Sequence, residues 1–329
     1  MAKQEFSIPK LASSITSEAD AYRKLEELRW GGDPTVCPKC GTEGGKFYFL
    51  NPANGTSRKT RTGSVSERRV WKCGSCRKQF SVLTDTIFHG TKISVRTWLL
   101  VIFEFVASKN SVSAWEISRK YEITNESAWH MLHRIREAMK REPVAGLMSG
   151  AIQADETWIG GNPANRHRND PRERPRKSNT SDKQPVFSLV HYETREVRSF
   201  VVNDVRAETL WEHFEAHTVP ERVWLQTDAS TSYRGKISKA VADHQYVDHA
   251  AGEYVGTGGA STNLAEAFFS MLKRAIRGTH MHVSIEHLHR YLAQADFMWT
   301  NNKMTDSERM RLLLGRVLGR RLTYKPLAG

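Results

Sequence analysis

The sequence predicts an α/β protein in which a mixed sheet flanked by helices follows a cysteine-rich module and a helical region. The main indication is the stretch from residue 151 to about 247, where apolar strand patterns and amphipathic helical patterns alternate. A pair of Cys-x-x-Cys motifs before residue 80 and helical periodicity over residues 92–141 predict the two preceding parts.

The composition narrows the classes of partner and location. The 329 residues include 49 lysines and arginines against 36 aspartates and glutamates, and the net charge of +13 favours a polyanionic partner. No apolar run reaches the roughly 18 residues of a membrane-spanning helix. The most apolar stretch, residues 97–107, is short and contains Glu104. The N-terminal residues lack the apolar core of a signal peptide, so we expect a cytoplasmic protein.

A helix is expected at residues 17–30, ahead of the cysteines. Ser17 is a suitable N-cap with Asp20 three residues later, and Leu25 and Leu28 belong to an apolar stripe. We interpret this helix as a packing element that docks the next module.

All four cysteines fall in two matched motifs, Cys37-Pro-Lys-Cys40 and Cys73-Gly-Ser-Cys76. This spacing is typical of a tetrahedral zinc site made of thiolates. The alternatives are a pair of disulfides, which a cytoplasmic setting disfavours, and a redox dithiol, which two matched motifs disfavour. The polar, basic segment 55–69 lies between the motifs as a hairpin tip. A zinc ribbon of this kind either contacts DNA or a partner, or only supports its neighbours.

Residues 92–141 predict consecutive helices. Ser94 can cap the first of them, and residues 111–124 and 125–141 form two helices joined by a short turn. This is the layout of a helix-turn-helix, whose second helix enters the major groove; the alternative is a plain helical bundle. The helix-turn-helix hypothesis leaves four basic side chains to reach DNA: His130, His133, Arg134 and Arg136.

Acidic residues end two of the predicted strands. The alternating residues 151–154 lead to Asp155 and Glu156, and the apolar run that begins at residue 223 ends at Asp228. Because neighbouring residues on a strand point to opposite faces, only one of Asp155 and Glu156 can join a site on a given face.

A third acid lies on a predicted amphipathic helix at residues 263–278. Asn263, Glu266 and Lys273 share one face of this helix. Two acids on strands and one on a helix suit a pair of Mg²⁺ or Mn²⁺ ions, which activate a hydroxyl and stabilise the leaving oxygen in phosphodiester chemistry. Ordinary surface charge is the alternative for any single acid. The Arg- and Pro-rich segment 162–184 is expected to form a loop that supplies a positive field, or a solvated excursion.

The motifs DETWIGG, TDAS and TNLAEAFFSMLKRAIRGTHMHVS, in this order, resemble those of the DDE-type insertion-sequence transposases, in particular the zinc-ribbon group called ISXO-like. The resemblance covers roughly residues 20–300. It implies a ribonuclease-H-like core, DNA as substrate, and an acidic triad at Asp155, Asp228 and Glu266 that holds magnesium. It further implies that Lys273 is the basic residue two helical turns after Glu266.

Two points of this resemblance bear on single residues. The family often has His-Thr-Asn before the helix, whereas this chain has Ser261 at the first of these positions. Some relatives are described with asparagine as the third member of the triad, so both Asn263 and Glu266 are candidates for it.

The main hypothesis from the sequence is therefore a DNA transposase that cleaves transposon ends and joins the 3′-hydroxyl to target DNA. The alternatives are a non-catalytic, sequence-specific DNA-binding protein that retains the core as a scaffold, and an RNA-cleaving enzyme with the same metal site. We expect a homo-oligomer on DNA, associated with the nucleoid when bound. The expected divisions are the N-terminal helix and zinc ribbon at 1–90, the helix-turn-helix-like region at 91–148, the catalytic domain at 149–300 and a basic helical tail at 301–329.

Overall fold

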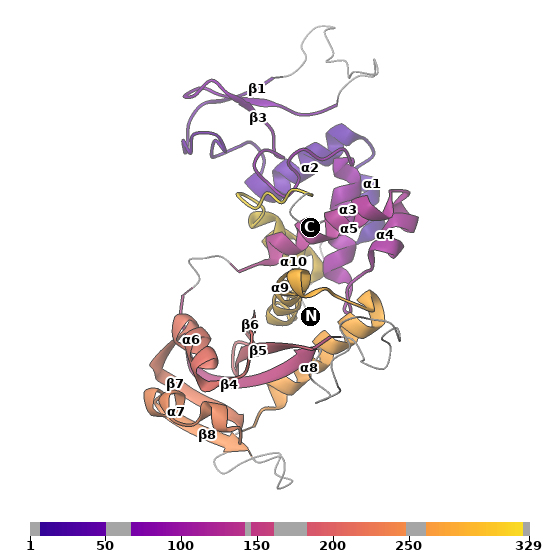
Figure 1. Cartoon of the computed structure of the whole chain (residues 1–329). Helices are drawn as coiled ribbons and strands as arrows, with labels where there is room; N and C mark the ends of the chain where they lie inside the picture. The colour runs from indigo at the N-terminus through magenta and orange to yellow at the C-terminus, as the bar shows by residue number, and fades with distance from the viewer. Residues whose placement is uncertain (1–6, 51–66, 142–145, 161–182, 248–260, 325–329) are drawn as a thin grey trace. The chain divides into compact units, whose positions relative to one another are not determined.

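The computed structural model describes residues 7–50, 67–141, 146–160, 183–247 and 261–324, which fall into two compact units (Figure 1). The first unit holds the chain up to Met139 together with the C-terminal segment from Lys303, and the second unit holds Lys140–Asn302. Most of the predicted basic tip at 55–69 and of the predicted loop at 162–184 lies outside the described residues. None of the helices in the described ranges is long and apolar enough to cross a membrane.

The first unit opens with α1 (Ile8–Ser14) and α2 (Glu18–Trp30). The second helix begins where the sequence predicts because Ser17 and Asp20 form a capping box. The Ser17 hydroxyl accepts from the Asp20 amide, and the Asp20 carboxylate accepts from the Ser17 amide. Gly31 ends the helix in the left-handed conformation, with φ 75°.

A small antiparallel sheet follows, in the order β1 (Phe47–Phe49), β2 (Trp71–Cys73) and β3 (Gln79–Phe80). A buried polar contact attaches the sheet to α2, in addition to the packing of Trp30 on Phe80. The buried Glu26 carboxylate of α2 accepts a 2.8 Å hydrogen bond from the Trp71 indole. A buried carboxylate needs such partners, so this contact fixes the helix against the sheet.

The rest of the first unit is helical, with α3 (Val95–Ala107), α4 (Ala114–Tyr121), α5 (Asn125–Met139) and α10 (Asp306–Gly315). The Ser94 hydroxyl caps α3 by accepting from the Thr97 amide, as the sequence predicts. The last helix comes from the C-terminal segment and packs against α2, α3 and α5. The two ends of the chain therefore share one core.

The predicted exposure of basic side chains on α5 is wrong. His133, Arg134 and Arg136 are at most 5% exposed, and His130 is partly buried. The Arg134 guanidinium lies 5.5 Å from the centre of the Trp98 ring. Helices α4 and α10 pack on α5, and α10 also packs on α3, so α5 is buried on more than one face. The arginine side chains on these buried faces stack on aromatic rings.

The second unit contains a five-stranded mixed sheet in the order β6-β5-β4-β7-β8. The central strand β4 pairs antiparallel with β5 and parallel with β7, and β6 and β8 form the edges. This confirms the predicted mixed sheet. The strands are β4 (Met148–Ile159), β5 (Gln184–His191), β6 (Val197–Val201), β7 (Thr218–Asp228) and β8 (Asp243–Val247).

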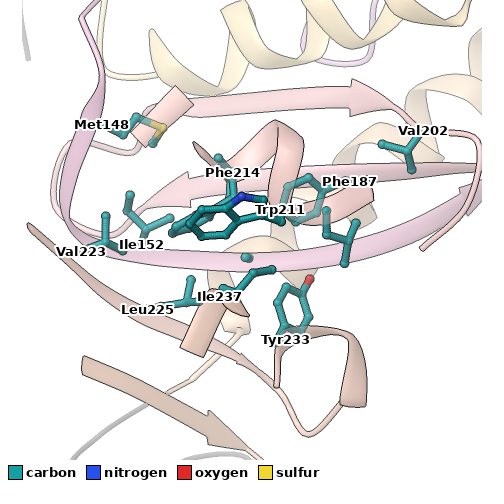
Figure 2. Packing of buried hydrophobic residues seen from close by; sticks show 13 residues of the cluster. Met148, Ile152, Phe187, Val202, Trp211, Phe214, Val223, Leu225, Tyr233 and Ile237 are labelled. Atoms are coloured by element: carbon teal, nitrogen blue, oxygen red, sulfur yellow. The ribbon is translucent and has the colours of Figure 1, made fainter. Parts of the chain in front are cut away.

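Helices cover both faces of this sheet. On one face, Trp211 and Phe214 of α6 pack with Tyr233 and Ile237 against Ile152 and its neighbours (Figure 2). On the other face, the apolar sides of α8 and α9 pack against β5 and β6. The elements around the sheet are α6 (Ala207–His217), a 3-10 turn (Thr231–Tyr233), α7 (Lys236–Ala240), α8 (Asn263–Ala275), a π-helix (Ile276–His280) and α9 (Ile285–Thr300).

Candidate active site and metal-binding cysteines

The four cysteines of the first unit converge on one point. Their sulfur atoms all lie within 4.8 Å of one another, and the Sγ–Sγ distances are 3.8 Å for Cys37–Cys76 and 3.9 Å for Cys40–Cys73. A disulfide needs about 2.05 Å, whereas sulfurs about 2.3 Å from a shared zinc ion stand at distances of this kind. The cysteines therefore fit a zinc ion, as predicted.

The local backbone brings the sulfurs together. The Gly74 amide donates to the Lys46 carbonyl at 2.8 Å, and a Cβ at Gly74 would lie 2.9 Å from that oxygen, so only glycine allows this approach. Burial raises the pKa of the Cys37 thiol to about 11, whereas a hydrogen bond with the Thr42 hydroxyl lowers the pKa of Cys40 to about 6. Zinc binds thiolates, so its binding would release protons here.

In the second unit, Asp155 and Asp228 lie at matching positions of adjacent strands. Parallel pairing of β4 with β7 includes Gln153 opposite Gln226, and each aspartate is two residues further on. Since side chains two residues apart share a face, both aspartates project to the face where α8 packs. The Ser230 amide donates to Asp228 Oδ1 at 3.0 Å, which orients this carboxylate.

The strand that carries Asp155 is longer than the sequence predicts. It extends to Ile159, so Asp155 lies inside β4 rather than at its end. The continuation is due to β5, which pairs with β4 as far as Ile159, whereas the pairing with β7 stops near Gln153. Asp155 is therefore still paired with β5 but lies just beyond the last residue of β4 that pairs with β7.

A cleft of about 710 Å³ lies between β4 and α8, and we call it the β4–α8 cleft. Asp155 and Glu266 both line it, together with Lys273, so three predicted site residues meet there. Asp228 and Asn263 are not among the lining residues, and Asn263 is exposed at the first turn of α8. The cleft is lined by Asp155, Glu156, Thr157, Glu266, Phe269, Ser270, Lys273, Arg274, Arg277 and Gly278.

Glu156 differs from its neighbour in environment. The Tyr233 hydroxyl, which belongs to the core on the α6 side of the sheet, donates a hydrogen bond to Glu156 Oε1. Burial raises the pKa of Glu156 to about 8, and the charges of Asp155 and Asp228 act in the same direction.

The basic wall of the cleft is wider than the sequence predicts. Arg274 and Arg277 join Lys273 along α8 and the π-helix. Burial lowers the pKa of the Lys273 ammonium, Arg277 acts in the same direction, and Asp155 opposes both. The spacing from Glu266 to Ser270, Lys273 and Arg277 is that of one helix face, and this spacing could have identified Arg277 from the sequence.

Comparison with known families gives two matches. Residues 147–300 match the ISXO2-like transposase domain, and residues 16–79 match the transposase zinc-ribbon domain. A protein of Halobacterium salinarum, described as an uncharacterized protein in transposable element ISH50, is 23% identical over 285 residues, which are 85% of this chain and 90% of that protein.

Two solved structures have low similarity to the chain. A chain of the simian T-cell lymphotropic virus intasome in complex with PP2A regulatory subunit B56 gamma has 13% identity and a TM-score of 0.28, with 62% of this chain and 69% of that chain covered. A chain of the pre-cleavage Mos1 transpososome has 13% identity and a TM-score of 0.27, with 65% and 76% covered.

The two family matches agree with the four-cysteine ribbon and the mixed sheet, and they confirm the resemblance seen in the motifs. The chain therefore carries an ISXO2-like transposase domain at residues 147–300 behind a transposase zinc-ribbon domain at residues 16–79.

Proposed function

We propose that this transposase cleaves the ends of its element and joins the resulting 3′-hydroxyl to target DNA at the β4–α8 cleft. The observation that carries the proposal is the meeting of Asp155 and Glu266 with a basic helix face in one cleft, with Asp228 on the adjacent strand. The match of residues 147–300 to a transposase domain supports the same reaction class.

The donor set fits divalent cations. Asp155, Asp228 and Glu266 offer carboxylate oxygens, which are the ligands that Mg²⁺ and Mn²⁺ prefer. When bound, a pair of such ions would activate the attacking oxygen and stabilise the leaving oxygen. Glu266 is the better candidate for the third ligand because it lines the cleft, whereas Asn263 does not.

The chain's own residues would bind and orient the DNA. Lys273, Arg274 and Arg277 offer positive charge to phosphate oxygens beside the acids. A water oxygen then forms a bond to phosphorus, the bond to the 3′-oxygen breaks, and the departing oxygen takes up a proton. In the second step that 3′-hydroxyl attacks a target phosphodiester, and the target's own 3′-oxygen leaves. Positioning and charge stabilisation suffice, without a covalent intermediate.

We further propose that zinc occupies the four cysteines, that the first unit contributes to DNA binding, and that more than one copy assembles on paired ends. A transposase has to pair the two ends of its element, and this requirement supports the assembly of more than one copy. The net charge of +13 supports DNA as the partner. A protein with this substrate would act in the cytoplasm, at the nucleoid.

The test is cleavage and strand transfer of a labelled duplex that carries the terminal sequence of the element encoding this chain. Wild type should produce joined product with Mg²⁺ and none with chelator, and Asp228→Asn should lose both steps while still binding the duplex. Asp243→Asn, an exposed aspartate on β8, is the matched control and should keep activity. Specific binding by wild type without cleavage under any metal would favour the non-catalytic DNA-binding protein instead.

A further inference from the structure

Gln153 is a fully buried polar side chain on β4, two residues before Asp155, which lines the cleft. Its Oε1 accepts from two backbone amides of α8, at 2.9 Å from Leu264 and 3.2 Å from Ala265. Its Nε2 donates to Gln226 Oε1 at 3.1 Å and lies 3.4 Å from the Ser261 hydroxyl. The Gln153 side chain therefore contacts both the adjacent strand β7 and the first turn of α8.

The bonds to α8 replace a local helix cap. The first amides of a helix have no partner within the helix and usually bond to a Ser, Thr, Asp or Asn side chain at the N-cap. Here the N-cap residue Thr262 makes no such bond, and its hydroxyl is directed to Glu266 Oε1 at 3.4 Å. Gln153 supplies the missing acceptor from another element, so the start of α8 is tied to β4 rather than to its own N-cap.

The bond to Gln226 sets the two aspartates relative to each other. Gln153 and Gln226 face each other in the parallel ladder, and Asp155 and Asp228 follow two residues later on the same face. Gln153 and Gln226 are the last pair in the register of the two strands, so their hydrogen bond joins β4 and β7 two residues before the carboxylates.

We propose that Gln153 is the positioning residue of the active site, which holds Asp155, Asp228 and Glu266 at a fixed mutual spacing through one buried amide. The inference deepens the proposed function and rests on it. The Gln153 amide meets both requirements, because its oxygen is the acceptor for α8 and its nitrogen is the donor for Gln226. A glutamate at this position would keep the acceptor but lose the donor and add negative charge below three acids.

The experiment compares Gln153→Leu with Gln245→Leu in the full-length chain without DNA. Gln245 pairs with Gln226 on the other side of β7, and its side chain donates to Asp243 of its own strand and to no other residue that the structure describes, so it is a matched control. The first measurement is the affinity for Mn²⁺ by electron paramagnetic resonance. The second is hydrogen exchange of the peptide that contains Leu264 and Ala265, with a β4–β5 peptide as the measure of an intact sheet.

Gln153→Leu should bind Mn²⁺ about 10–100-fold more weakly, as is usual when a residue that orients metal ligands is lost. The Leu264 and Ala265 amides should exchange about tenfold faster, in line with loss of a helix cap. The β4–β5 peptide and the control variant should match wild type. Unchanged Mn²⁺ affinity in Gln153→Leu would overturn the inference, even if α8 exchanges faster.

Two further variants keep the outcome interpretable. Asp155→Asn should abolish the Mn²⁺ site; if it does not, the proposed function fails independently of Gln153. If Gln153→Leu does not fold, Gln226→Leu decides, because it removes the link between β7 and β4 and leaves both bonds to α8. It should weaken Mn²⁺ binding with normal exchange at Leu264, and wild-type affinity would again overturn the inference.

Discussion

Replacing Asp296 with asparagine should stabilise the second unit increasingly as the pH rises. Asp296 lies on α9, and its carboxylate accepts from the Ser199 amide at 2.9 Å and the Ser199 hydroxyl at 2.6 Å. Burial between α9 and the sheet raises its pKa to about 7, against the partial opposing effect of these hydrogen bonds. The folded protein therefore retains a proton that the unfolded chain has already lost.

The sign and size follow from this difference. Between the ordinary pKa of 3.8 and the folded value of about 7, the folded state binds more protons than the unfolded state, so stability falls as pH rises. The stability that the folded state loses relative to acid pH, where Asp296 is protonated in both states, grows from about 2 kcal/mol at pH 5 to about 4 kcal/mol at pH 8, at 1.36 kcal/mol per pKa unit. Asparagine cannot ionise and still accepts one bond, so it removes this pH-dependent cost.

The assay is urea unfolding of the full-length chain, followed at β5 and β6 by peptide-resolved hydrogen exchange at pH 5, 6.5 and 8. The difference in unfolding free energy between Asp296→Asn and wild type should move in favour of the variant by about 2–3 kcal/mol from pH 5 to pH 8. Asp243→Asn removes an exposed charge from the same unit and should show no comparable rise. A difference that stays constant over this pH range would refute the argument that burial keeps Asp296 protonated.

Three further predictions concern the metal sites and the basic wall. Cys73→Ser should remove the zinc and speed hydrogen exchange in β1–β3, with exchange in β4 and β5 unchanged; equal zinc content in variant and wild type would contradict the four-thiolate site. Asn263→Ala should keep Mn²⁺ affinity and Glu266→Gln should lose it, measured by titration; the reverse pattern would make Asn263 the third ligand. Lys273→Gln should weaken binding of DNA duplexes of any sequence and lower the salt slope by about 1, and a change confined to one sequence would show base reading instead.

Local patterns predicted much of the fold because they act over a few residues. The capping box at Ser17 and Asp20 defines the start of α2, and the Ser94 hydroxyl caps α3. The cysteine spacing was likewise enough for the ribbon. For the site, Asp155, Glu266 and Lys273 were identified from the sequence, and all three line the cleft.

The parts that local patterns could not predict depend on contacts between distant segments. Arg134 and Arg136 appear as a solvated face in the sequence, but α10 belongs to the same core as α5, and nothing local indicates this. The extent of β4 beyond Asp155 depends on pairing with β5 across the segment 161–182. The role of Gln153 depends on Gln226 and Leu264, which are 73 and 111 residues away.

The division of the first unit between the two ends of the chain has a consequence for biosynthesis. The second unit is one continuous stretch, Lys140–Asn302, so all its strands and helices have been translated before α10 exists. The first unit must wait for α10, whose Met310, Leu313 and Leu314 are buried. On the ribosome the sheet with the acidic residues can therefore fold before the ribbon-bearing unit completes its core, in the reverse of the N-to-C order usual for multidomain chains. A nascent chain that is released early would carry a finished second unit joined to an unfinished first unit.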